Sequence, residues 1–394
     1  MVGLADGRVH PTDEMTSRQR LLAAYRREPV DRLPFWAKVT NGTWRRSQPD
    51  RIRKLSDRDL LDYIHADGIF HAPRCARATS PRAEVAETID GNVRTRVTHT
   101  PDGDLVERWT QDPTTGSWHP TEFPVKTRED LRRFRWLCEQ RIEPPDDDEA
   151  ARARQRVEEI GQRGISKTGW GTSPLMHLVE HVIGPAGTMY FLADYPDEMD
   201  ELIAQMHEAN QELVRAVAER TPADLVVSVE NTSTSLISPG QFERYCRRHL
   251  CDYGRIIERA GKMHELHMCG LLYDLLERID TIPAASIEAF TAPPLANTRL
   301  ADGKARCPGK TFVGGTCVNV WWRHTPGEIR RYVRGELDAC PDHWGIVLTT
   351  AGVAPPACSA ETFRAVGQWI PSVPLRGPRD RPGQPPSAKE PARE

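Results

Sequence analysis

The chain has 394 residues, of which 38% are hydrophobic and 28% are charged, which is ordinary for an enzyme with a substantial core. The length exceeds the roughly 100–200 residues of a common domain but suits one large α/β barrel with insertions. The net charge of −3 gives no electrostatic basis for binding nucleic acid or an anionic membrane. We therefore expect the partner to be a small-molecule substrate.

The nine cysteines are dispersed, without the regular spacing of a disulfide framework. An odd, scattered set is typical of reduced thiols, so we expect a cytoplasmic protein. The first residues contain no apolar segment of the kind that a secretory signal requires. No apolar run approaches the roughly 20 residues of a membrane-spanning helix, so we expect no membrane association.

The N-terminal part contains two of the predicted barrel strands. Residues 1–15 are expected to form a flexible lead-in, and Thr16 or Ser17 can cap the helix that follows. The predicted elements here are a helix over 16–27, a strand over 32–40, a helix over 57–65 and a strand over 68–73.

Residues 84–124 have a different sequence pattern from the segments on either side. Thr, Val and Arg alternate in V-R-T-R-V-T-H-T, then P-D-G-D can form a tight turn before L-V-E-R-W-T. This pattern predicts a β-hairpin inserted into the main domain. His99 and His119 lie in this hairpin, where exposed histidines are common, so neither is a favoured ligand.

After the hairpin, short apolar runs alternate regularly with helical patterns. A strand that passes into a loop over 164–171 precedes a long amphipathic helix over 196–220. Further strands are predicted over 223–230, 262–269, 284–290, 311–317 and 345–350. With the two earlier strands this makes eight, which favours a single (β/α)8 barrel over 16–375. No Gly-rich phosphate fingerprint supports a doubly wound fold, and residues 376–394 are expected to form a flexible tail.

Chemically active residues gather at the ends of consecutive predicted strands, where barrel enzymes place their chemistry. His267 and Cys269 are two residues apart, so in a strand they point to the same side and could form half of a zinc site. A buried cysteine beside a satisfied core histidine is the alternative. The other strand ends carry Glu230, Glu288 and Cys317, and each also has a structural interpretation: a loop cap, an arginine partner and a packed small residue.

Three weaker candidates complete the set. Cys246, His249 and Cys251 share one helix with aromatic residues, which indicates a surface facing the core. Trp321 and Trp322 could form an aromatic wall for a flat ligand or cover the end of the barrel. His264 is a weaker candidate for a residue that transfers a proton or supports the metal ligands.

Several segments, in order, resemble the uroporphyrinogen decarboxylase superfamily. They are M-T-S-R-Q-R-L-L-A-A-Y-R-R-E-P-V-D-R-L-P-F-W near the start, P-V-K-T-R-E-D-L, E-N-T-S-T-S-L-I-S-P-G-Q-F-E-R-Y, H-M-C-G, S-I-E-A-F and L-T-T-A-G-V-A-P-P. The resemblance covers about residues 15–370 and implies a (β/α)8 barrel. The decarboxylase proper has an Arg-rich loop after the first strand. Here that stretch reads F-W-A-K-V-T-N-G-T-W, so tetrapyrrole decarboxylation is not expected.

The resemblance is stronger to the corrinoid-dependent (methylcobamide) methyltransferase branch. That branch implies zinc held by an H-x-C pair, a glutamate and a later cysteine, which places His267, Cys269 and Glu288 in the metal site. The later cysteine aligns with Ala351. Cys317, Cys358 or Glu230 would then have to supply the fourth ligand.

These observations predict a zinc-dependent methyltransferase or demethylase. It would act with a corrinoid (methylcobamide) or folate-type carrier on a small methylated substrate or a thiol, and a corrinoid protein is the expected partner. Zinc would act as a Lewis acid on a bound thiol or hydroxyl. One alternative is a metal-independent decarboxylase or lyase of the same superfamily, with Glu230 and Glu288 as acid and base. Another is a non-catalytic protein that binds a tetrapyrrole or corrinoid.

Overall fold

The computed structural model describes residues 6–378, apart from 41, 77–78, 114–115, 143 and 145. Most of the predicted tail over 376–394 lies outside the described residues, so its flexibility stays a prediction. Among the described residues, no helix has both the length and the apolar character needed to cross a bilayer.

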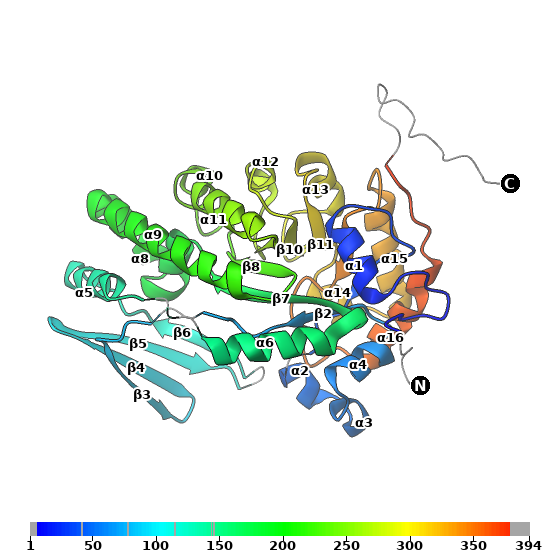
Figure 1. The fold of residues 1–394 in the computed structure, drawn as a ribbon, viewed down its shortest axis with the longest axis horizontal. Coiled ribbons are helices and arrows are strands. Elements are labelled where there is room, and N and C mark those ends of the chain that lie inside the picture. The colour runs from blue at the N-terminus through cyan, green and yellow to red at the C-terminus, as the bar shows by residue number, and fades with distance from the viewer. Residues whose placement is uncertain are drawn as a thin grey trace.

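Eight parallel strands form a nearly closed barrel, as the sequence predicted (Figure 1). Their order around the sheet is β1, β12, β11, β10, β9, β8, β7 and β2. The strands are β1 (Phe35–Trp36), β2 (Gly68–His71), β7 (Gly164–Gly171), β8 (Leu225–Val229), β9 (Met263–His267), β10 (Ser286–Phe290), β11 (Thr311–Gly314) and β12 (Ile346–Thr349). Each one overlaps a strand predicted from an apolar run.

Helices surround the barrel and bury the apolar outer side of its strands. The main ones are α4 (Asp57–Tyr63), α5 (Arg128–Glu139), α6 (Asp147–Ile160), α8 (Pro185–Asp194), α9 (Pro196–Arg220), α11 (Arg248–Arg259), α12 (Leu276–Asp280), α15 (Pro326–Asp338) and α16 (Ala360–Trp369). Short helices that the sequence did not predict are α2 (Gly42–Ser47), α3 (Asp50–Arg53), α13 (Leu300–Arg306) and α14 (Val318–Arg323).

Helix α1 (Ser17–Tyr25) closes the amino end of the barrel. Thr16 caps it in a full capping box with Gln19. Tyr25 packs with Ile165 and Leu225, which lie near the amino ends of their strands. Because this end is filled by apolar side chains, the open end for a ligand is the carboxyl end, which is where barrel enzymes place their sites.

Residues 6–15 differ from the flexible lead-in that we expected. Val9, His10 and Asp13 are buried against the barrel. Asp13 bonds to the guanidinium of Arg32 at 2.8 Å. A buried carboxylate needs such a partner, and this pairing between separate segments could not be recognised from local sequence.

The inserted segment is a four-stranded antiparallel sheet, larger than the predicted hairpin. Its strands are β3 (Glu84–Asp90), β4 (Val93–Thr100), β5 (Gly103–Gln111) and β6 (Trp118–Glu122). The predicted turn after Thr100 joins β4 to β5. The sheet lies to one side of the barrel near α5, so it is a separate layer (Figure 1).

Candidate functional site

The centre of the candidate site is a pair of side chains on neighbouring strands. His267 on β9 is in register with Glu288 on β10. Neighbouring strands in register point paired side chains to the same side, and Nδ1 of His267 forms a hydrogen bond with Oε2 of Glu288. The sequence predicted that these two residues lie together, and the structure brings them into direct contact.

Two lysines bring positive charge to Glu288. Nζ of Lys38 forms an ion pair with Oε1 of Glu288. Nζ of Lys167 lies 4.0 Å from Oε2 and bonds to Glu265 at 2.9 Å. Burial disfavours the Glu288 carboxylate, but Lys38, Lys167 and His267 together hold its pKa well below its usual range. Glu288 is therefore ionised across the physiological pH range.

His267 is the matching cation. Burial disfavours the imidazolium, but hydrogen bonds with Cys269 and Glu288 outweigh this effect and raise the pKa of His267 to about 9. Cys269 is exposed at the end of the strand, and its Sγ lies 3.1 Å from Oδ1 of Asn231. The ring is therefore charged at neutral pH, and an accessible thiol lies beside it.

These groups open into a cavity of about 410 Å³ at the carboxyl end of the barrel. Trp36, Val227, Val229 and Val353 supply apolar walls next to the charged groups. The size and the mixed lining are those of a small-molecule site. Its lining is Trp36, Lys38, Thr40, Ile69, His71, Lys167, Gly169, Val227, Val229, His267, Glu288 and Val353.

Glu230, which we expected to be catalytic, does not line this cavity. Its carboxylate is fully buried and accepts hydrogen bonds from the backbone N–H and the hydroxyl of Ser173 and from the hydroxyl of Thr172. This arrangement ties the loop after β7 to the end of β8. It favours the structural interpretation that the sequence left open, which is a loop cap.

The expected additional zinc ligands are also elsewhere. Cys317 is fully buried and its Sγ faces the carbonyl of Pro293 at 3.8 Å. Cys358 is buried, and burial raises the pKa of its thiol to about 12. Ala351 is buried as well and has no donor side chain.

A zinc ion with a complete protein shell needs three or four donors. Among the described residues, no group of three or more His, Cys, Asp or Glu side chains could hold a metal ion. Glu288 also already forms an ion pair with Lys38. The residues present therefore do not fit a fully ligated zinc ion, and zinc binding by the His267–Cys269 pair stays a prediction.

The weaker candidates are packed into the fold. Cys246, His249 and Cys251 are buried, as predicted for a helix surface facing the core. The ring of His264 on β9 forms a hydrogen bond with the hydroxyl of Ser228 on β8 at 2.8 Å. His264 does not line the cavity. Trp321 is buried in a stack with Phe35 and Phe363, so it belongs to the core.

Several polar residues of the site were missed in the sequence, namely Thr40 and His71 of the cavity lining, two lysines, Asn231 and Glu180. Lys38 and Lys167 lie within predicted strands, and a lysine inside a buried strand is itself a signal, since buried lysines need a paired charge. Asn231 and Glu180 gave no such signal. They meet only in the folded chain, where Nδ2 of Asn231 donates to Glu180 at 2.9 Å.

The fold and the site define a TIM-type barrel protein with a polar site at the carboxyl ends of its strands. The model of the uroporphyrinogen decarboxylase (URO-D) family matches residues 141–366, more than half of the chain. The chain therefore belongs to this family. No curated protein matches the sequence. A solved structure of a methyltransferase from Methanosarcina mazei aligns over 90% of this chain and 97% of that chain, with a TM-score of 0.57 and 15% identity. At this identity, the likeness shows the fold.

Proposed function

We propose that this protein is a methyltransferase that removes a methyl group from a small methoxy or methylthio compound. The observation that carries the proposal is the charged pair of His267 and Glu288 beside the exposed Cys269 at the mouth of the barrel. Two further findings support it: the H-x-C arrangement that the methyltransferase branch shares, and a fold similar to that of a methanogen methyltransferase.

Demethylation needs a proton for the departing atom, and His267 can supply it. When the carbon–oxygen or carbon–sulfur bond breaks, the methyl group passes to an acceptor and the electron pair stays on the leaving oxygen or sulfur. Glu288 occupies Nδ1 of His267, so the ring donates through Nε2, where the substrate would replace Cys269 as the hydrogen-bond partner. Transfer of the Nε2 proton gives a neutral alcohol or thiol, a general-acid step of the kind that contributes about 10²–10⁴-fold to a rate.

The acceptor must come from outside the cavity. A corrinoid or folate-type carrier, brought by a partner protein, would supply the nucleophile that takes the methyl group. The cavity of about 410 Å³ suits the small substrate. The thiol of Cys269 is exposed, so the mouth is accessible to a carrier.

A metal-independent decarboxylase or lyase is the second candidate, and one observation favours it. Lys38 and Lys167 place two ammonium groups at the cavity, where they could hold a substrate carboxylate. His267 would then protonate the carbanion that forms when carbon dioxide leaves. In this alternative, the acid is His267 in place of Glu230, which is buried elsewhere.

The test is methyl transfer to free cob(I)alamin, followed by absorbance, with a panel of methoxy and methylthio compounds. We expect the wild-type protein to form methylcobalamin and His267→Gln to lower the rate by about 10²-fold or more. The matched control is His99→Gln on the exposed insertion sheet, which should leave the rate unchanged. An equal rate for His267→Gln would contradict the proposal. Release of carbon dioxide from a carboxylate panel, without methyl transfer, would favour the second candidate.

A further inference from the structure

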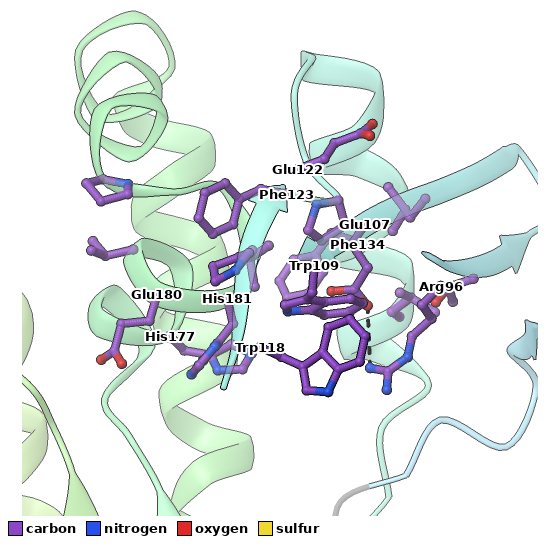
Figure 2. A pocket seen from close by; sticks show the side chains of 18 of the residues that line it. Arg96, Glu107, Trp109, Trp118, Glu122, Phe123, Phe134, His177, Glu180 and His181 are labelled. Atoms are coloured by element: carbon purple, nitrogen blue, oxygen red, sulfur yellow. Dashed lines mark hydrogen bonds and ion pairs between the residues drawn. The ribbon is translucent and has the colours of Figure 1, made fainter. Parts of the chain in front are cut away.

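A second, larger cavity lies between the insertion sheet and the segment that follows β7. Its volume is about 790 Å³. One wall comes from β5, β6 and α5, and the other from the helical turns that carry His177, Glu180 and His181 (Figure 2). This volume suffices for a ring-containing ligand. Neither the family match nor the similar fold assigns a ligand to this cavity.

The sheet side of this cavity is aromatic. Trp109, Trp118, Phe123 and Phe134 all line it. The guanidinium of Arg94 lies 4.3 Å from the ring centre of Trp109 and 5.1 Å from that of Trp118, so it braces the two indoles from the sheet. Rings fixed in this way offer flat surfaces to another planar molecule.

The ionisable groups of the sheet wall are paired with one another. Arg96 bonds to Glu87 at 2.9 Å and contacts Glu107 at 3.4 Å. Glu122 forms ion pairs with Arg108 and Lys126. The wall therefore offers no unpaired charge to a ligand.

The helical wall is close to neutral for a different reason. Burial lowers the pKa of His177 to about 3 and also lowers that of His181, so both rings are uncharged at neutral pH. Burial also raises the pKa of Glu180 to about 7, which leaves much of this carboxyl group protonated. An ionised ligand would gain little here to offset the loss of its hydration.

The carboxylate of Glu180 is not directed at the aromatic wall (Figure 2). Its Oε2 accepts a hydrogen bond from Asn231, and Oε1 is buried without a hydrogen-bond partner among the described residues. Because Oε1 is shielded in this way, it offers a ligand in the cavity no hydrogen bond. Asn231 in turn contacts Cys269, so Glu180 is two contacts away from the reaction centre.

We propose that this cavity binds a neutral, planar aromatic molecule. The aromatic wall selects the flat ring, and the paired and uncharged lining selects against an ion. This inference does not rest on methyl transfer.

The test is calorimetric titration of the full-length protein at about pH 6 with three matched probes: benzamide, benzoate and cyclohexanecarboxamide. Benzoate keeps the ring but carries a negative charge at this pH, and cyclohexanecarboxamide keeps the amide but loses the planar ring. We expect benzamide to bind and each of the other two to bind at least about 10-fold more weakly. Equal binding of benzoate or of cyclohexanecarboxamide, or no binding of benzamide, would overturn the proposal.

Two variants locate the site in different ways. Trp118→Leu removes an aromatic surface, and Leu236→Trp fills part of the cavity. Both should weaken benzamide binding at least about 10-fold, with Trp322→Ala as a control, since Trp322 is exposed and outside the cavity. Circular dichroism shows whether each variant is folded. If both folded variants bind benzamide like the wild type, the assignment fails. No methyl donor is present, so failure of the methyl-transfer assay would leave these results unaffected.

Discussion

The charge of His267 depends on the carboxylate of Glu288, and this dependence makes the proposed chemistry sensitive to pH. The pKa of His267 is raised to about 9, so the ring loses its proton only as the pH rises through that value. The proposed proton donor is therefore present below about pH 9 and lost above it.

We expect kcat to fall on the alkaline side with a midpoint near pH 9 in the wild-type protein. Glu288→Gln removes the carboxylate that stabilises the imidazolium, so its alkaline midpoint should move to lower pH. A pH–rate profile of both proteins checks this. The same alkaline midpoint in both would show that another group controls the rate.

The residue at position 351 affects whether the site can hold zinc. Ala351 lies where the resemblance implies a cysteine, and among the described residues no group of three or more His, Cys, Asp or Glu side chains could hold a metal ion. We expect the wild-type protein to retain less than one zinc per chain after dialysis, and Ala351→Cys to bind zinc more tightly because it adds a thiolate. Elemental analysis of both proteins measures this. Stoichiometric zinc in the wild type that is lost in His267→Ala would contradict this expectation and restore the zinc-dependent mechanism.

Substitutions of Glu230 distinguish a structural role of this residue from a catalytic one. Glu230→Ala leaves the donors of Thr172 and Ser173 without an acceptor in a buried place, which should cost about 3 kcal/mol in the free energy of unfolding. Glu230→Gln retains an acceptor oxygen and should cost about 1 kcal/mol. Urea unfolding measures both. Wild-type stability in Glu230→Ala, combined with loss of activity, would return Glu230 to a catalytic role.

The same residue should affect the pH dependence of stability. Burial raises the pKa of Glu230 to about 7, above its value in the unfolded chain. Its contribution to stability is then fully present below about pH 4.5 and is lost as the pH rises through about 7. Stability of Glu230→Gln should fall less than that of the wild type over this range, which unfolding at several pH values can measure.

At the scale of elements, buried ion pairs join α1 to the start of the barrel. Asp67, directly before β2, accepts from Arg20 on α1 at 2.8 Å and from Arg32 at 2.9 Å. Asp67→Ala would leave both guanidinium groups partly unpaired in the interior, at a cost of about 3–5 kcal/mol. Arg51→Ala, which removes only an exposed pair with Glu361, should change stability by less than about 1 kcal/mol. Equal effects in chemical denaturation would refute this assignment.

The barrel strands could be predicted because each is a short apolar run, and buried parallel strands are read from such runs. The four short helices could not, because they have too few residues for a periodic pattern. Nor could the π-helical turn η2 (Leu178–Val182), which carries Glu180 and His181, because its i→i+5 geometry depends on contacts made after folding.

Part of the candidate site could also be predicted from the positions of the predicted strands. His267, Cys269 and Glu288 stand at predicted strand ends, so the topology alone brings them together. Their partners cannot be found this way, because the Lys38–Glu288 pair joins the segment after β1 to β10, which is far away in the chain. Hydrogen-bond partners of this kind are set by barrel closure.

At the scale of the whole molecule, a chain of polar contacts runs between two cavities of opposite character. The cavity at the barrel mouth contains charged groups, and the larger cavity beneath the insertion sheet is aromatic and close to neutral. Glu180, Asn231 and Cys269 join them through successive polar contacts. The insertion sheet supplies the aromatic wall of the larger cavity, which the barrel alone does not provide.

The central claim is that His267 is a charged proton donor held by Glu288. The most direct measurement is an NMR titration of the protein labelled in its histidine rings, with the His267 signal assigned by its loss in His267→Gln. We predict that this ring titrates near pH 9 in the wild type and at clearly lower pH in Glu288→Gln. A ring that is already neutral at pH 7 in the wild-type protein would contradict the account.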